Sequence, residues 1–285
     1  MMMLKKIPRK EALLEAVLTR ERERKAAVKR MEKEIQKLYD GYFLRVTKFL
    51  ASKEFATKTE IINLESTQRA LTQLSQILVE AGYEDTIASL QDEFEGLTKS
   101  TLKYFNTFGP GDPLPGIDLE SLQVYATFVE KEFTLAIDRN LKAPIQSALL
   151  QVNLGNQTRE SVVETILGLS DKTTPAQAEL IVDDGFSQYQ RAVIVQKAEN
   201  LDMEIYQYLG PDDSITSEQC EFMLDVDRHG VPGMLYKDEI TTDLHPKLVY
   251  NPLVAGGHPR CRHHWSPVTE AYAVSQGFEL RKEAA

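Results

Sequence analysis

Residues that could bind a metal ion are concentrated in one short part of this sequence. Both cysteines, all five histidines and the single tryptophan lie between Cys220 and Trp265. Thiolate and imidazole are the ligands that zinc prefers, and four of them close a structural site. The ligands that this grouping predicts are Cys220, Cys261 and His263, with His258 or His264 as the fourth.

The elements that must position these residues form a small α+β module over residues 201–285. Residues 204–209 alternate in polarity and are rich in aromatic side chains, which is typical of a strand. Gly, Pro, Asp and His are frequent beyond this strand and indicate loops and short elements. Trp265 is predicted to lie in the core, since a small module needs a large apolar anchor.

The preceding two thirds of the chain predict one helix after another. We expect long N-terminal helices over residues 1–108 and a second helical region over 117–200, separated by the Gly- and Pro-rich segment 109–116. The fold class is therefore mainly α, followed by the small α+β module. The individual helices are predicted over residues 10–52, 59–81, 84–108, 118–141, 158–168 and 175–200.

Three local signals refine these helices. The first helix carries an apolar stripe spaced by three and four residues from Val28 to Phe49. Its earlier run, 19–25, alternates charges and has no apolar face, so we expect it to be an exposed helix or an arm. Pro144 is expected to kink or end the fourth helix, and Gly82 is expected to end the second as a C-terminal cap.

Charge and hydropathy exclude some classes of protein. The net charge is −10, although residues 1–40 carry +5 and the remaining chain −15. An acidic body disfavours sequence-independent DNA binding, which needs clustered cations. The basic start is either a solvated helix face or a contact for nucleic acid or an acidic partner. No apolar run is long enough for a transmembrane helix, and no secretory signal is expected, so the product should stay in the cytosol where it is made.

Two segments of the module carry a recognisable pattern. The first is the turn Asp213–Thr216, with Cys220 four residues later. The second is the run from His258 and Pro259 through Cys261 and Arg262. A helix with Arg191 in mid-span and a strand through Tyr206 and Tyr208 precede them.

This pattern resembles the C-terminal region of phage minor head proteins, the head morphogenesis or Mu F-like family, over residues 175–268. Family members carry a Cys-x-x-Cys pair after the turn, and here Ser217 stands where the first Cys would be. His263 replaces the final Cys of the closing motif. One thiolate of a four-ligand metal site is therefore missing.

The resemblance implies a structural minor component of a phage head or head–tail connection rather than an enzyme. Such a protein is made in the host cytoplasm, enters the virion and docks on the portal protein. It assists head assembly or DNA delivery, so its partners would be the portal, other head proteins and packaged DNA. The resemblance implies no catalytic residue and no cofactor.

Three interpretations of the two cysteines stay open. They are small buried residues with no further chemistry, ligands of a zinc ion, or a disulfide that forms after the particle leaves the reducing cytosol. We favour a metal-free module, because the serine hydroxyl at position 217 is a poor zinc ligand.

The competing function is a metal-dependent nuclease that uses the Cys/His cluster. Such a site needs a histidine as general base and a metal held by further ligands. His263 and His264 are adjacent, so in a strand they would point to opposite faces and could not easily serve one metal. The sequence has no phosphate-binding P-loop, no Gly-x-Ser-x-Gly elbow and no His-Glu-x-x-His motif.

Overall fold

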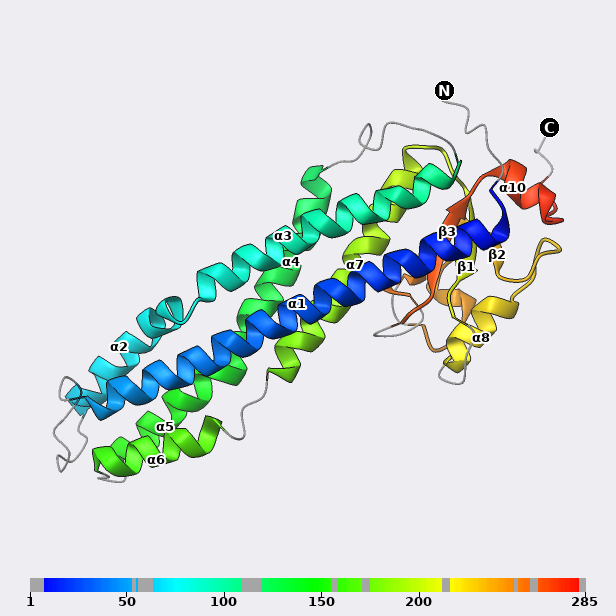
Figure 1. Cartoon of the computed structure of the whole chain (residues 1–285). Helices are drawn as coiled ribbons and strands as arrows, with labels where there is room; N and C mark the ends of the chain where they lie inside the picture. The colour runs from blue at the N-terminus through cyan, green and yellow to red at the C-terminus, as the bar shows by residue number, and fades with distance from the viewer. Residues whose placement is uncertain are drawn as a thin grey trace. The chain divides into compact units, whose positions relative to one another are not determined.

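The chain is mainly α-helical and carries one small antiparallel sheet near its C-terminus, as the sequence predicts (Figure 1). The structure is a computed structural model. The residues that it describes are 8–52, 55, 64–108, 119–154, 158–170, 175–211, 216–248, 251–256 and 261–281.

The fold divides into two compact units that are each assembled from separate parts of the chain. Unit 1 comprises Met1–Ala27, Phe94–Ala126 and Asp183–Ala285. Unit 2 comprises Val28–Glu93 and Thr127–Val182. The sequence-based division into 1–108, 117–200 and 201–285 follows the chain order, whereas these units do not. Four helices each contribute residues to both units: α1 (Lys10–Ala51), α3 (Tyr83–Leu102), α4 (Leu119–Ile137) and α7 (Ala176–Glu199).

Unit 2 is a packed group of helices. Besides its parts of the four shared helices it contains α2 (Leu64–Glu80), α5 (Ala143–Leu154) and α6 (Arg159–Ser170). The predicted apolar stripe of α1 faces its core, where Ile35, Tyr42 and Val46 are fully buried. Gly82 follows α2 with a φ of 105°, a backbone conformation that favours glycine after a helix.

Pro144 does not end the helical path of the fourth predicted helix. A π-helical turn, Asp138–Lys142, follows α4, and Pro144 lies in the first turn of α5. The Ala143 N–H bonds to the Asp138 carbonyl five residues earlier, as in a π-helix. The hydrogen-bond pattern is thus already shifted directly before Pro144, which has no N–H to donate.

Unit 1 contains the sheet, whose strand order is β2-β1-β3 with both pairs antiparallel. The strands are β1 (Ile205–Leu209), β2 (Met234–Tyr236) and β3 (His264–Val268), and all residues of β1 and β3 are buried. The predicted strand at 204–209 is thus confirmed, and Trp265 is 1% exposed. Short elements surround the sheet: the 3-10 helix η1 (Lys103–Phe108), α8 (Glu218–Asp225), α9 (Pro252–Ala255) and α10 (Glu270–Ser275).

The charged run 19–25 is helical, but the expectation that it is exposed is wrong. Arg20, Glu21 and Arg24 are 1%, 6% and 3% exposed within unit 1. Their burial is tolerated because Glu21 and Arg24 bond to each other and because Arg20 lies over the ring of Tyr104.

Within the described residues, no helix has both the length and the hydrophobicity of a membrane span.

Candidate metal centre

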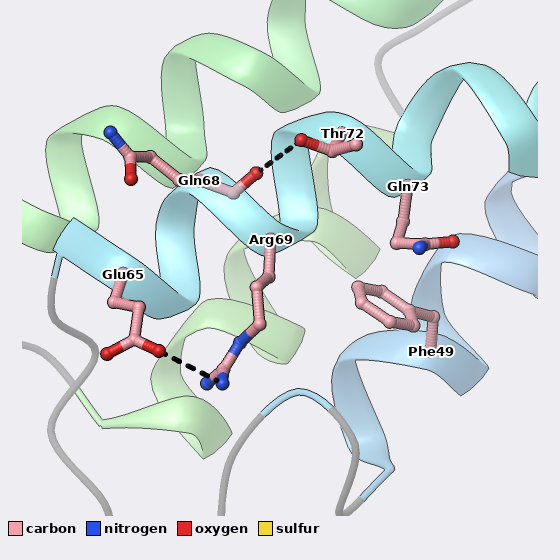
Figure 2. A pocket seen from close by; sticks show the side chains of 6 residues that line it. All are labelled: Phe49, Glu65, Gln68, Arg69, Thr72 and Gln73. Carbon is pink, nitrogen blue, oxygen red and sulfur yellow. Dashed lines mark hydrogen bonds and ion pairs between the residues drawn. The ribbon is translucent and has the colours of Figure 1, made fainter.

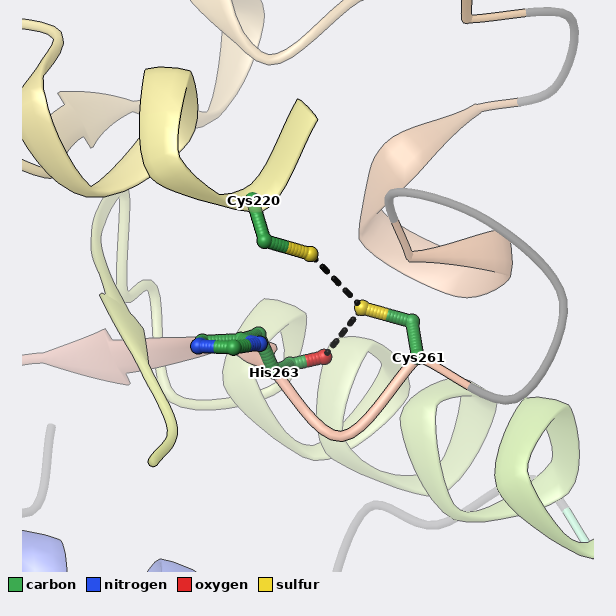
Figure 3. A group of neighbouring side chains, drawn as sticks. All are labelled: Cys220, Cys261 and His263. Atoms are coloured by element: carbon green, nitrogen blue, oxygen red, sulfur yellow. Dashed lines mark hydrogen bonds between the residues drawn. The ribbon is translucent and has the colours of Figure 1, made fainter. Parts of the chain in front are cut away.

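Cys220, Cys261 and His263 meet in the interior of unit 1 (Figure 3). Cys220 lies in the first turn of α8, and the other two residues lie in the segment that leads into β3. The two Sγ atoms are 3.4 Å apart, and the potential ligand atoms all lie within 4.8 Å of one another. The three residues are only 1%, 1% and 2% exposed. The structure therefore brings together the three residues that the sequence predicts as the core of the site.

Ser217 positions Cys220 rather than joining the cluster. Its backbone is extended, and its side chain accepts a hydrogen bond from the Cys220 N–H over 3.3 Å, so it is the N-cap of α8. Thr216 precedes the helix and donates a hydrogen bond from Oγ1 to the carbonyl of Pro211 at 3.2 Å. The serine at position 217 thus has a local structural use.

Tyr208 of β1 lies against all three residues of the cluster. Its hydroxyl is 3.3 Å from Cys220 Sγ and 3.5 Å from Cys261 Sγ. Its ring stacks on the His263 ring with a centroid distance of 5.3 Å and an interplanar angle of 10°. Gly210 leaves room for that imidazole, because a Cβ atom at this position would lie 2.4 Å from His263 Cδ2.

The two thiols differ in acidity because one donates to the other. The hydrogen bond from Cys220 lowers the pKa of Cys261 well below its usual range, even though burial opposes ionisation, and nearby Arg191 adds to the effect. The same hydrogen bond, together with burial, raises the pKa of Cys220. The two buried sulfur atoms therefore share one hydrogen bond over 3.4 Å.

Arg191, in mid-span of α7, fixes the backbone around Cys261. Its Nη2 donates to the Cys261 carbonyl at 2.7 Å, and its Nη1 donates to the Val254 carbonyl at 3.3 Å. Its Nε lies 3.2 Å from Nδ1 of His264. His264, the alternative fourth ligand, is thus directed at Arg191 rather than at the cysteines. Gly256 permits the approach, since a Cβ there would lie 2.8 Å from Arg191 Nη2.

The network continues into α1 through residues that the sequence analysis missed. His264 Nε2 lies 3.9 Å from Glu21 Oε2, and Arg24 donates to both oxygens of Glu21 at 3.0 and 2.8 Å. Arg24 also pairs with Asp183 of α7. The i, i+3 spacing of Glu21 and Arg24 was the available signal, because it places opposite charges on one helix face.

Burial and neighbouring charges set the ionisation of this network. Burial disfavours the Glu21 carboxylate, but the His264 ring and Arg24 outweigh it and lower the pKa of Glu21 below its usual range. Burial, and then the charge of Arg20, lowers the pKa of His264 to about 3, which keeps the ring neutral. Burial also lowers the pKa of Arg20 to about 10. No guanidinium nitrogen of Arg20 has a hydrogen-bond partner among the described residues.

Part of the predicted motif lies outside the described residues: Asp213, His258 and Pro259. Arg262 is described and half-buried, between Cys261 and His263 in the chain.

A separate pocket of about 440 Å³ lies in unit 2 (Figure 2). It is lined by Phe49 of α1 and by Glu65, Gln68, Arg69, Thr72 and Gln73 of α2. Arg69 pairs with Glu65 at 3.5 Å, and Thr72 donates to the Gln68 carbonyl at 3.0 Å. These polar groups already bond to one another at an exposed surface. The pocket is therefore a weaker candidate for a functional site than the buried cluster.

Comparisons with known proteins leave the chain without an assigned family. No protein-family model matches it, and neither a curated protein nor a solved structure does.

Proposed function

We propose that this chain is a structural minor component of a phage head or head–tail connection that docks on the portal protein. The proposal starts from the resemblance over residues 175–268. Its main support is that Cys220, Cys261 and His263, distant in sequence, share one buried cluster. Arg191 and Tyr208, also part of the resemblance, contact that cluster or its backbone. A motif whose residues hold one module together is what a structural role needs.

The burial of the cluster favours this proposal over a metal-dependent nuclease. A nuclease must bring a phosphodiester to its metal and its general base. His263 and His264 are 2% and 1% exposed. Nδ1 of His264 is also occupied by Arg191. Within the part of the chain that the structure describes, both rings are buried away from a substrate of nucleic-acid size, whereas a structural cluster needs no such access.

Particle composition tests the proposal. Virions purified by density gradient should contain the chain in far fewer copies than the major capsid protein, as measured by quantitative mass spectrometry. The purified chain should also bind the portal oligomer of the same phage in a pull-down. Gly210→Val, which forces a side chain into the His263 ring, should reduce both signals. Glu80→Gln, a change at an exposed pair of unit 2, is the matched control and should reduce neither.

Two outcomes would contradict the structural role. One is a chain abundant in the infected-cell lysate and absent from purified particles. The other is cleavage of DNA or RNA by the metal-loaded chain that Cys261→Ser abolishes, which would support the nuclease.

A further inference from the structure

We propose that Cys220, Cys261 and His263 bind one zinc ion and that the Tyr208 hydroxyl occupies the fourth position. The sequence alone favours a metal-free module, because Ser217 replaces a thiolate. The geometry reverses that preference by supplying an oxygen from a different element, β1. The inference goes beyond the proposed function and would hold for a chain with any other role.

The spacing of the donor atoms fits a tetrahedral ion. With Zn–S bonds of about 2.3 Å and Zn–O bonds of about 2.0 Å, the sulfurs of a tetrahedron are about 3.8 Å apart and each lies about 3.5 Å from the oxygen. The Sγ–Sγ distance here is 3.4 Å, and the Tyr208 hydroxyl lies 3.3 and 3.5 Å from the two sulfurs. The two sulfurs and the oxygen would thus need to move by only a few tenths of an ångström to hold an ion, and the imidazole nitrogen, which lies within 4.8 Å of both sulfurs, would complete the site by approaching them.

The imidazole is available for coordination. His263 is 2% exposed, and its Nε2 has no hydrogen-bond partner among the described residues. A buried polar atom without a partner is costly, and no hydrogen bond to this nitrogen has to be broken when an ion binds. Stacking on Tyr208 and the close approach of Gly210 already fix the plane of the ring. The ligand is thus held in place before the metal arrives.

The donor set selects the metal. Two thiolates and an imidazole are soft to borderline ligands, which suit zinc rather than magnesium or calcium. Binding of Zn²⁺ forms two Zn–S bonds, one Zn–N bond and one Zn–O bond; it releases the protons of the two thiols to water, and the Tyr208 hydroxyl keeps its proton. The Arg191 hydrogen bond to the Cys261 carbonyl acts on the backbone of a ligand and so positions it.

The bound ion would tie α8 to the segment before β3. Among the described residues, weak contacts between the two sulfur atoms and with the Tyr208 hydroxyl join these segments. Metal affinity in such a site is folding free energy, because the ligands converge only in the folded state. Zinc should therefore stabilise unit 1, where Trp265 is the single tryptophan of the chain.

The first experiment measures metal and stability on the full chain purified with a reductant. Inductively coupled plasma mass spectrometry should find about one zinc ion per chain, as expected for one closed site. A chelator should lower the unfolding midpoint reported by Trp265 fluorescence, and added zinc should restore it. Cys220→Ser, Cys261→Ser and His263→Gln should each lose most of the zinc. Thr269→Ala, which removes the N-cap of α10 instead, is the matched control and should keep it.

The second experiment stays informative if a ligand variant fails to fold. Co²⁺ added to the metal-free wild-type chain should give sulfur-to-cobalt charge-transfer bands and the intense visible bands of a tetrahedral site. Zinc should displace these bands and protect both thiols from alkylation. The zinc site is refuted if the reduced chain has no zinc, no tetrahedral cobalt spectrum and no response to chelator. A mass lower by two hydrogens without added oxidant would show a disulfide instead.

Tyr208→Phe tests the fourth ligand separately. The variant keeps the stacking ring and the three other donors, so it should still bind one metal ion. Loss of the oxygen should alter the visible cobalt bands and weaken zinc affinity by about tenfold or more, the range seen when the surroundings of a metal site are changed. An unchanged spectrum and affinity would remove Tyr208 from the assignment.

Discussion

Two of the arginine–glutamate pairs of helix α1 have the same chemistry and different surroundings. Arg24 pairs with Glu21 in unit 1, where the side chains are 3% and 8% exposed. Arg45 pairs with Glu80 of α2 in unit 2, where they are 48% and 49% exposed and 3.6 Å apart. The residue types therefore do not reveal which pair matters for the fold. What separates the two pairs is burial and the presence of further partners.

The difference follows from solvation. An exposed pair is screened by water and salt and contributes about 0–1 kcal/mol. A buried pair loses its hydration, so each charge depends on every partner that remains. Glu21 and Arg24 belong to a network with His264 and Asp183, and Arg191 continues it to the backbone of the candidate metal centre. A substitution at any residue of this network should therefore lower the stability of unit 1.

The largest effect is expected at Arg191. Arg191→Met keeps an extended apolar side chain but leaves the Cys261 and Val254 carbonyls without their donor. We expect a loss of about 3–5 kcal/mol in the free energy of unfolding, typical of breaking a buried charged network. Urea unfolding followed by Trp265 fluorescence measures it. Arg45→Met is the matched control, and far-ultraviolet circular dichroism must follow both variants because Arg45 lies in unit 2. Equal losses in the free energy of unfolding for the two substitutions would contradict the comparison between the pairs.

Glu21→Gln should have the next largest effect, and it should depend on pH. At pH 7 we expect a loss of about 2–3 kcal/mol, because Arg24 loses a charged hydrogen-bond partner and the His264 ring loses the carboxylate 3.9 Å away. The folded-state pKa of Glu21 lies below the ordinary value of 4.5 for a glutamate side chain. Its contribution is therefore fully present above about pH 4.5 and is lost as the pH falls toward the folded-state pKa.

The difference in stability between wild type and Glu21→Gln should consequently narrow from pH 6 to pH 3. Fluorescence-monitored urea unfolding at both pH values measures this difference. A constant difference would show that Glu21 acts through packing rather than through its charge.

The smallest effect is expected at the exposed pair. Glu80→Gln should change the free energy of unfolding by about 0–1 kcal/mol, and salt should remove even that difference. Far-ultraviolet circular dichroism is the appropriate probe, because Trp265 lies in unit 1. The same salt titration on Glu21→Gln should leave its larger loss nearly intact, since buried charges are poorly screened. A large effect at Glu80 would mean that exposure does not distinguish the two pairs.

The sequence predicted what local patterns encode. The apolar stripe of α1, the aromatic strand at β1 and the burial of Trp265 follow from periodicity and side-chain size, and all three are found. The grouping of Cys220, Cys261 and His263 could also be predicted, because those residue types are rare in the chain and concentrated near its C-terminus.

Two features could not be predicted, for a physical reason. A polar helix face looks the same in sequence whether it meets water or other polar side chains, so the burial of Arg20, Glu21 and Arg24 was missed. Their partners His264 and Asp183 are too distant in the chain for any local window to connect them. Likewise, the hydroxyl of Tyr208 reaches the two sulfurs only after β1 has paired in the sheet.

The discontinuity of unit 1 has a consequence for the synthesis of the protein. The N-terminal part of a nascent chain emerges first, so Glu21 and Arg24 leave the ribosome long before His264 has been synthesised. Unit 2, by contrast, is complete once Val182 has emerged. Contacts of such long sequence separation also form slowly, because the loop between them must close first. Unit 2 can therefore fold during translation, whereas unit 1 must mature after it, and chaperones and proteases would act on the chain in that interval.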